Sequence, residues 1–371
     1  MNSALRLLCF STLLTIFGFA GVQPLAVTLM EKQGLGATAI GVLSALIFGG
    51  VLVLAPFQPA LVEHFGAMAT YQAGKALATL GFAGCAWATT PWNWAISLLL
   101  LGLGGALTWP LTDSLISTEA PAGKKGAWVG LFQAGMGLAF AIGPFASAAL
   151  ATRPTLVFLG AAGICFLSSL PLIGKHLPTP DDGHEAGGWE IWRSAGGLAV
   201  VAFLGGLFEN GTHTAGTLVA LALGWSGAAS VALPGVIAAG SFAIQYPLGR
   251  VADQRGTRGV LLASLLGLAL SLAAMPLVGQ WSPLLWALGF VWGAASGCLY
   301  TLAMTSSAQD FPDRKIASVT TLLVLGYTVG SAIGPVLGGL AVDASPQWGM
   351  AAVFGPMAVI GWVVAFRQRA V

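Results

Sequence analysis

Two ionisable side chains within the apolar stretch 196–221 are the residues of this chain best suited to chemistry. Glu209 and His213 lie there among apolar and glycine residues, with Asn210 beside them. Because residues four positions apart share a helix face, the carboxyl and the imidazole would lie side by side in a helix. A buried acid in such a segment marks a pathway for protons or cations. We therefore predict proton coupling or cation binding at this pair. A structural hydrogen bond between helices is the alternative.

A second acid, Asp113, lies near the end of the apolar stretch 93–116. We expect it to contribute to proton coupling or to an inner gate, paired with Lys75 or with loop residues. A water-exposed acid at the membrane interface is the alternative.

Isolated polar and aromatic side chains occur in other apolar stretches. Each either lines a solute cavity or bonds one helix to another. Glycines on both sides of Glu209 also suggest a locally broken helix, whose free backbone groups would bind solute. With Asn210, the candidate cavity residues are Gln23, Gln133, Gln245, Tyr300, Tyr327 and Trp109.

The composition excludes most soluble classes of protein. Hydrophobic residues make up 56% of the 371 residues and charged residues only 8%, whereas soluble domains carry about 25% charged residues. We find no basic patch for nucleic acid, no metal-ligand or redox spacing of the four cysteines, and no phosphate-binding loop. We therefore expect no nucleic-acid partner, no metal, no cofactor and no enzymatic activity. An enzyme acting on lipids would need clustered His, Asp or Cys residues at one interface.

Runs of about 20 apolar residues, the length that crosses a membrane as a helix, recur along the chain. We predict an all-α membrane protein with two six-helix bundles, 1–175 and 196–371, joined by a cytoplasmic linker, 176–195. The predicted spans are 5–30, 37–62, 68–89, 93–116, 127–151, 155–174, 196–221, 228–250, 259–279, 283–307, 317–341 and 348–366.

Lysine and arginine positions predict the orientation. With the N-terminus in the cytoplasm, only Lys32 and Arg153 lie outside, and this bias follows the positive-inside rule. An even number of spans then places both termini in the cytoplasm. The residues counted as cytoplasmic are Arg6, Lys75, Lys124, Lys125, Lys175, Arg193, Arg250, Arg255, Arg258, Arg314, Lys315, Arg367 and Arg369.

Features of the first half recur at one spacing in the second half. This regularity predicts two parallel repeats, as in carriers whose halves rock about a central site. Glu63 and Gly66 recur as Asp253 and Gly256, Lys124–Lys125 recur at the same offset as Arg314–Lys315, and Gly143–Pro144 recur one position further on as Gly334–Pro335.

At these residues the chain resembles the major facilitator superfamily, and in particular its small bacterial inner-membrane permeases. The run from Gly249 to Arg258 is similar to the family's G-x-x-x-D-x-x-G-R-[RK] loop. The glycine-proline elements in spans 5 and 11 resemble one that the family associates with proton-coupled exporters. The resemblance implies gating roles, with membrane topology and close helix packing as the alternatives, for Glu63, Gly66, Gly249, Arg250, Asp253, Arg255, Gly256, Arg258, Gly143, Pro144, Gly334 and Pro335.

The resemblance also implies a function. It predicts a monomeric secondary transporter in the bacterial cytoplasmic membrane, in contact with lipid, that exports a small organic solute in exchange for protons. A largely apolar cavity with one acid favours an amphiphilic or cationic solute. A proton symporter that imports a metabolite is one alternative. A scaffold or sensor is another, favoured because the first copy of the loop lacks the arginines. Leu98 stands where the family often has an arginine in span 4.

Overall fold

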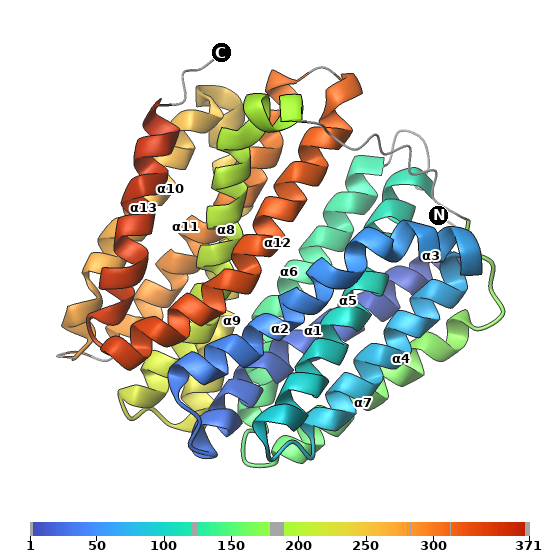
Figure 1. Cartoon of the computed structure of the whole chain (residues 1–371), viewed down its shortest axis with the longest axis horizontal. Helices are drawn as coiled ribbons and strands as arrows, with labels where there is room; N and C mark the ends of the chain where they lie inside the picture. Colours follow the sequence, from blue (N-terminus) through green and yellow to red (C-terminus); the bar gives the residue numbers. More distant parts are fainter. Residues whose placement is uncertain are drawn as a thin grey trace. The chain divides into compact units, whose positions relative to one another are not determined.

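The computed structural model describes residues 3–119, 125–178, 189–279, 281, 283–311 and 313–367 (Figure 1). The regular structure of these residues is helical throughout. The elements are α1 (Ser3–Lys32), α2 (Ala37–Leu54), η1 (Ala55–Phe57), α3 (Gln58–Phe65), α4 (Ala67–Cys85), α5 (Pro91–Glu119), α6 (Lys125–Ala149), α7 (Pro154–Ser169), η2 (Leu170–Leu172), α8 (Trp189–Ala222), α9 (Gly227–Arg255), α10 (Thr257–Ala273), η3 (Met275–Gly279), α11 (Leu284–Asp310), α12 (Asp313–Ala344) and α13 (Gly349–Arg367).

Each predicted span corresponds to one helical segment. The second span consists of α2, η1 and α3 in succession, and the sixth and ninth each end in a short 3-10 turn. Among the described residues, ten segments are long and apolar enough to cross a membrane, and α10 is a shorter apolar helix. The prediction of an all-α membrane fold with about twelve helices is confirmed.

Helix α8 is continuous through the glycines around Glu209. The prediction of a locally broken helix there is therefore wrong. The glycines serve packing instead, because a methyl group on Gly206 would overlap the Tyr327 carbonyl oxygen of α12. On Gly211 it would lie 2.9 Å from the Gly334 carbonyl oxygen.

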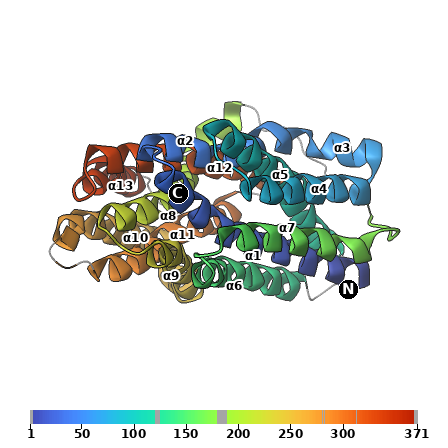
Figure 2. The ribbon, with the colours of Figure 1, turned by 90° about the horizontal axis from the view of Figure 1, so that it is seen from below.

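The chain forms two compact units. The first contains Met1–Leu29 and Leu46–Asp182, and the second contains Met30–Ala45 and Gly183–Val371. Helix α2 thus has its first part, up to Ala45, in the second unit and the remainder in the first. Helices α8 to α13 of the second unit pack on one another, with α8 beside α12 and α9 beside α11 (Figure 2).

Two pairs of turns show the internal repeat in the backbone. Gly34 and Gly224 have φ of 84° and 79°. Gly66 and Gly256, which are separated by the same offset as the first pair, have φ of 84° and 86°. Glycine adopts such positive φ values without the steric cost that a side chain would bring. The spacing in the sequence therefore corresponds to equivalent turns at the starts of equivalent helices.

The glycine stripe of α12 lies directly on the backbone of α8. A methyl group on Gly330 or Gly334 would overlap a carbonyl oxygen of α8, that of Phe203 or Leu207. Methyl groups on Gly326 and Gly338 would lie 2.9 Å from the carbonyl oxygens of Ala199 and Gly211. Successive glycines four residues apart therefore meet successive carbonyl groups four residues apart, which is close packing through small residues.

In the first unit the corresponding contact joins α1 and α6. A methyl group on Gly143 would lie 2.7 Å from the Phe17 carbonyl oxygen, and one on Gly21 would lie 2.7 Å from the Gly143 carbonyl oxygen. Both helices that carry a glycine-proline element, α6 and α12, therefore use its glycine for close contact, and both continue past the proline.

We predict that Gly330→Ala destabilises the second unit, because the added methyl group has no space against α8. Overpacking of this kind costs about 1–3 kcal/mol. Thermal unfolding in detergent measures the effect. The matched control is Gly196→Ala in α8, where an added methyl group meets nothing within 4 Å. Equal unfolding temperatures for the two variants would contradict the packing described above.

Candidate functional site

Glu209 lies in a partly buried polar cluster inside the second unit. Its Oε2 accepts a hydrogen bond of 2.9 Å from the Tyr327 hydroxyl of α12. The Tyr327 ring lies against Tyr300 of α11, with ring centroids 4.8 Å apart and ring planes at 50°. Together with Asn210, His213 and Ser331, these residues are called the Glu209 cluster below. The carboxyl group is therefore held by a phenol hydroxyl whose ring packs against a second tyrosine.

Hydrogen bonds between α8 and α12 fix the cluster. The Asn210 amide donates to the Ser331 hydroxyl at 3.0 Å and to the Gly206 carbonyl oxygen at 3.4 Å. Ser331 is buried and donates to the Tyr327 carbonyl oxygen at 2.8 Å. Helices α8 and α12 already touch through their glycines. The hydrogen bond from Asn210 to Ser331 adds a specific side-chain contact between the same two helices.

The His213 imidazole has a buried Nε2 without a hydrogen-bond partner in the described part of the chain. Although His213 is four residues from Glu209 on α8, the hydrogen bond to the carboxylate comes from Tyr327. Sequence reasoning missed this bond and the role of Ser331. Tyr327 and Ser331 each follow a glycine of the α12 stripe, and this was the signal that could have identified them.

The remaining candidate cavity and coupling residues are not part of the Glu209 cluster. Gln245 lies on α9 in the second unit. In the first unit, Trp109 and Asp113 are one turn apart on α5, and the Trp109 side chain hydrogen-bonds to Asp113. Gln133 is exposed on α6, whereas Gln23 of α1 has a buried Nε2 without a partner among the described residues.

Lys75 is the main ionisable residue that the sequence analysis misplaced. It lies in the middle of α4 with a relative exposure of 1%, so it does not belong in a count of loop charges. Its ammonium group donates to the Ser11 carbonyl oxygen at 3.2 Å, to Thr15 Oγ1 at 2.5 Å and to Ser168 Oγ at 3.0 Å. Three neutral acceptors thus match the three donors of a protonated lysine, in place of the predicted pairing with Asp113.

The hydroxyl groups around Lys75 are already oriented by their own bonds. Ser168 donates to the Cys165 carbonyl oxygen, and Thr15 donates to the Ser11 carbonyl oxygen. Each hydroxyl thus uses its proton on another acceptor, and its oxygen can still accept a hydrogen bond from Lys75. This arrangement fits an ammonium group, which can only donate. The first unit therefore contains a buried lysine amine held by hydroxyl and carbonyl oxygens of α1 and α7.

We predict that removing an acceptor of Lys75 costs more stability than removing Lys75 itself. Ser168→Ala would leave a buried N–H of an ammonium group unpaired, at a cost of about 1–3 kcal/mol. Lys75→Met keeps the length of the side chain and removes an amine whose burial is itself costly. Unfolding temperatures of the two variants in detergent test this order. A larger loss for Lys75→Met would show that the charge itself stabilises the unit.

The charged candidate gating residues lie toward helix ends, whereas the two glycine-proline pairs lie inside α6 and α12. Glu63 and Arg250 are exposed on α3 and α9, and Gly249 lies beside Arg250. The side chains of Asp253 and Arg255 lie outside the described residues. Arg258 of α10 donates to the Phe366 carbonyl oxygen and lies over the Phe366 ring at 5.5 Å. The Arg258 guanidinium group thus binds the C-terminal end of α13, within the second unit.

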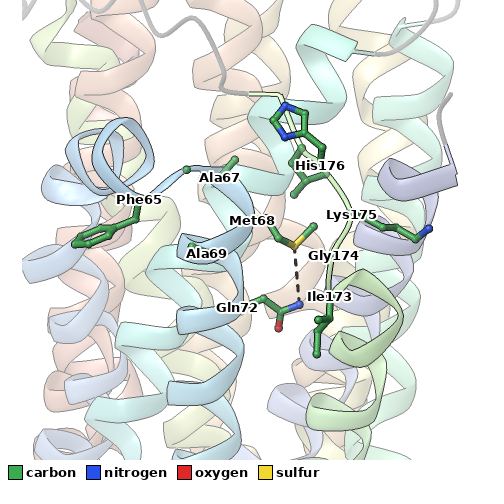
Figure 3. A pocket seen from close by; sticks show the side chains of 11 residues that line it. Phe65, Ala67, Met68, Ala69, Gln72, Ile173, Gly174, Lys175 and His176 are labelled. Atoms are coloured by element: carbon green, nitrogen blue, oxygen red, sulfur yellow. Dashed lines mark hydrogen bonds between the residues drawn. The ribbon is translucent and has the colours of Figure 1, made fainter.

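A groove of about 590 Å³ lies in the first unit, between the α3–α4 corner and the chain after η2. In Figure 3, Met68 and Gln72 lie along the groove on α4, and Phe65 points away from it. The Gln72 amide donates to the Ser169 carbonyl oxygen at 3.0 Å and to Met68 Sδ at 3.9 Å. Of the predicted site residues, only Gly66 borders this groove. The groove is therefore separate from the Glu209 cluster.

Comparison with known proteins decides the family. The model described as Major Facilitator Superfamily matches residues 8–244 and 198–370. The chain belongs to the major facilitator superfamily. This confirms the resemblance drawn from the loop and the glycine-proline elements, and it makes the chain a multi-pass membrane transporter protein by family.

Relatives of this transporter extend over most of its length. The uncharacterized MFS-type transporter YfkF of Bacillus subtilis is 26% identical over 341 residues, covering 88% of this chain and 86% of YfkF. The uncharacterized MFS-type transporter YcaD of Escherichia coli O45:K1 is 23% identical, covering 89% and 86%.

Solved structures share the fold. The nucleoside transporter NupG superposes with a TM-score of 0.77 at 13% identity and covers 98% of both chains. A bacterial homologue of the lysosomal transporter Spinster gives a TM-score of 0.76 at 16% identity, covering 98% of this chain and 96% of the homologue. At such identities the likeness establishes the fold alone.

Proposed function

We propose that this transporter exports a small cationic or amphiphilic organic solute by alternating access, in exchange for protons. Membership of the major facilitator superfamily supports secondary transport. The observation that supports coupling is the Glu209 carboxyl group, whose hydrogen bond inside the helical bundle comes from a neutral phenol, Tyr327.

The coupling step follows from charge balance. An ionised carboxylate among apolar groups is costly unless a proton or a cation neutralises it. When a solute cation arrives, the proton leaves Glu209 and the carboxylate pairs with the cation, so the cluster keeps its net charge. In the reverse step, the proton returns as the solute leaves. His213, whose Nε2 has no partner in the described part, is the proposed relay: it accepts the departing proton and passes it on to water, so that no proton stays in the cluster.

The aromatic pair supports the solute class. The faces of Tyr300 and Tyr327 attract cations and flat apolar groups. The Tyr327 hydroxyl bonds to the Glu209 carboxyl group, and the Tyr327 ring packs against Tyr300. A carboxyl beside aromatic faces suits a protonated amine carried on an apolar body. Asn210, held by Ser331, supplies the neighbouring polar contact. We place the protein in the bacterial cytoplasmic membrane as a monomer with cytoplasmic termini, in line with the loop charges and the bacterial relatives.

The first test measures proton flux in proteoliposomes that contain a pH-sensitive dye. Under an imposed pH gradient, pools of cationic, zwitterionic and anionic solutes are added to wild type and to variants. We expect flux with the cationic pool, in the direction of antiport, because solute and proton exchange at one carboxyl group. Glu209→Gln should abolish this flux, and His213→Ala should reduce it.

The matched control is Glu119→Gln, which changes an exposed glutamate at the end of α5 and should keep wild-type flux. Flux of the opposite sign would show proton symport instead of export. Equal flux in Glu209→Gln and wild type would remove Glu209 from the mechanism. A wild-type protein that binds cationic solutes without any flux would favour the scaffold or sensor function.

A second test changes only the partner of the carboxyl group. Tyr327→Phe keeps the aromatic face and removes the hydroxyl that donates to Glu209. Hydrogen bonds to charged groups contribute about 1.5–3 kcal/mol, so we expect coupled flux to fall about tenfold or more, but not to vanish. Flux is measured in the same liposomes. A complete loss, as in Glu209→Gln, would mean that the phenol itself carries the proton.

A further inference from the structure

Helix α2 begins without a capping side chain of its own. The first N–H groups of a helix have no partner within the helix and need an acceptor. In the second repeat, α9 begins at Gly227, and the Ser226 hydroxyl before it accepts from the Ala229 N–H at 3.2 Å. The equivalent position before α2, at the offset of the repeat, is Gly36, which has no side chain. The cap that α9 has locally is therefore missing in α2.

Asp343, near the C-terminal end of α12, supplies this cap. Its Oδ1 accepts from the Ala37 N–H at 3.0 Å, and its Oδ2 accepts from the Thr38 N–H at 2.8 Å and from Thr38 Oγ1 at 2.6 Å. A carboxylate at a helix N-terminus is also favoured by the helix dipole. Three hydrogen bonds thus join two helices that lie far apart in the sequence.

Backbone contacts accompany the cap. A methyl group on Gly41 of α2 would overlap the Pro335 carbonyl oxygen of α12, and one on Gly339 of α12 would overlap the Ala37 carbonyl oxygen. Residues 30–45 accordingly belong to the second unit, whereas α2 from Leu46 onward belongs to the first. Helix α2 therefore has its beginning packed on α12 and its remainder packed in the other unit.

We propose that Asp343 is a detachable clasp, which holds the beginning of α2 on α12 in one state of the transport cycle and releases it in another. A cap from the preceding residue would stay with α2 at all times. A cap from α12 exists only while α2 and α12 are in contact. The N-terminus of α2 therefore loses its cap whenever it separates from α12. Asp343 is exposed and Thr38 only partly buried, so water can take over their hydrogen bonds when the clasp opens, which keeps the cost of opening small. The predicted topology places this end outside the cell.

The space at Gly36 makes the proposal testable. A Cβ there would lie 3.8 Å and 3.9 Å from the two carboxylate oxygens of Asp343, which is ordinary contact distance, and Gly36 does not have a positive φ. Serine therefore fits at position 36 and can cap α2 as Ser226 caps α9. Gly36→Ser restores the cap without restoring any link to α12.

The experiment uses the full chain with its four cysteines replaced by alanine and with Ile40→Cys as the reporter. Ile40 is fully buried in α2, so a water-soluble maleimide labels this position only when the helix leaves its packing. The labelling rate and the unfolding temperature are measured for the background, for Asp343→Ala, and for Asp343→Ala combined with Gly36→Ser.

We expect Asp343→Ala to raise the labelling rate about fivefold or more and to lower the unfolding temperature. In the double variant the unfolding temperature should recover, because α2 has a cap again, while labelling should stay fast, because the link to α12 is still missing. If both the unfolding temperature and the slow labelling recover in the double variant, Asp343 is only a local cap and the proposal is wrong. Unchanged labelling in Asp343→Ala would also overturn the proposal.

If Asp343→Ala does not fold, Thr38→Val tests the same expectation, because it removes only the hydrogen bond from Thr38 Oγ1 to Asp343. Neither readout needs solute or proton flux, so the outcome is independent of the function proposed for Glu209.

Discussion

The direct contact between the backbones of α8 and α12 is the constraint on which the second unit depends. Lipid offers no hydrophobic force to hold two apolar helices together, so their association relies on close packing and on polar bonds. The four glycines of the α12 stripe allow the carbonyl groups of α8 to approach. This contact brings Tyr327 and Ser331 opposite Glu209 and Asn210. A side chain in place of Gly330 or Gly334 would separate the helices and open these bonds.

The fold could be predicted from the sequence because length and apolarity alone determine where helices cross a membrane. The approximate positions of the twelve helical segments, the repeat and the family followed from apolar runs, glycine turns and one loop. The break predicted in α8 was wrong because glycines occur in membrane helices for two different structural reasons. A run of glycines is compatible with an unwound helix or with a partner backbone, and only the position of α12 distinguishes them.

The site could be predicted less well, for a related reason. Glu209 and Tyr327 were both candidates, but sequence spacing pairs Glu209 with His213 on its own helix, whereas the structure pairs it with Tyr327, 118 residues away. Lys75 was counted with the cytoplasmic charges, although it lies within the predicted span 68–89. Its partners Ser11, Thr15 and Ser168 come from two other helices, and no local pattern marks a serine or threonine that faces a lysine.

The two repeats share a backbone plan but place their charges differently. Lys75 in α4 corresponds to Leu265 in α10, which is also buried, and Glu209 in α8 corresponds to Phe19 in α1. The equivalent turns at Gly66 and Gly256 show that the helices themselves are aligned. One unit therefore buries a lysine amine among hydroxyls, and the other holds a carboxyl group on a phenol hydroxyl. A buried charge needs its own set of partners, and each repeat has built that set around a different position. The caps differ between the repeats in the same way. Helix α9 is capped by the local Ser226, whereas α2 is capped by Asp343 of the other repeat, whose carboxylate is exposed to water.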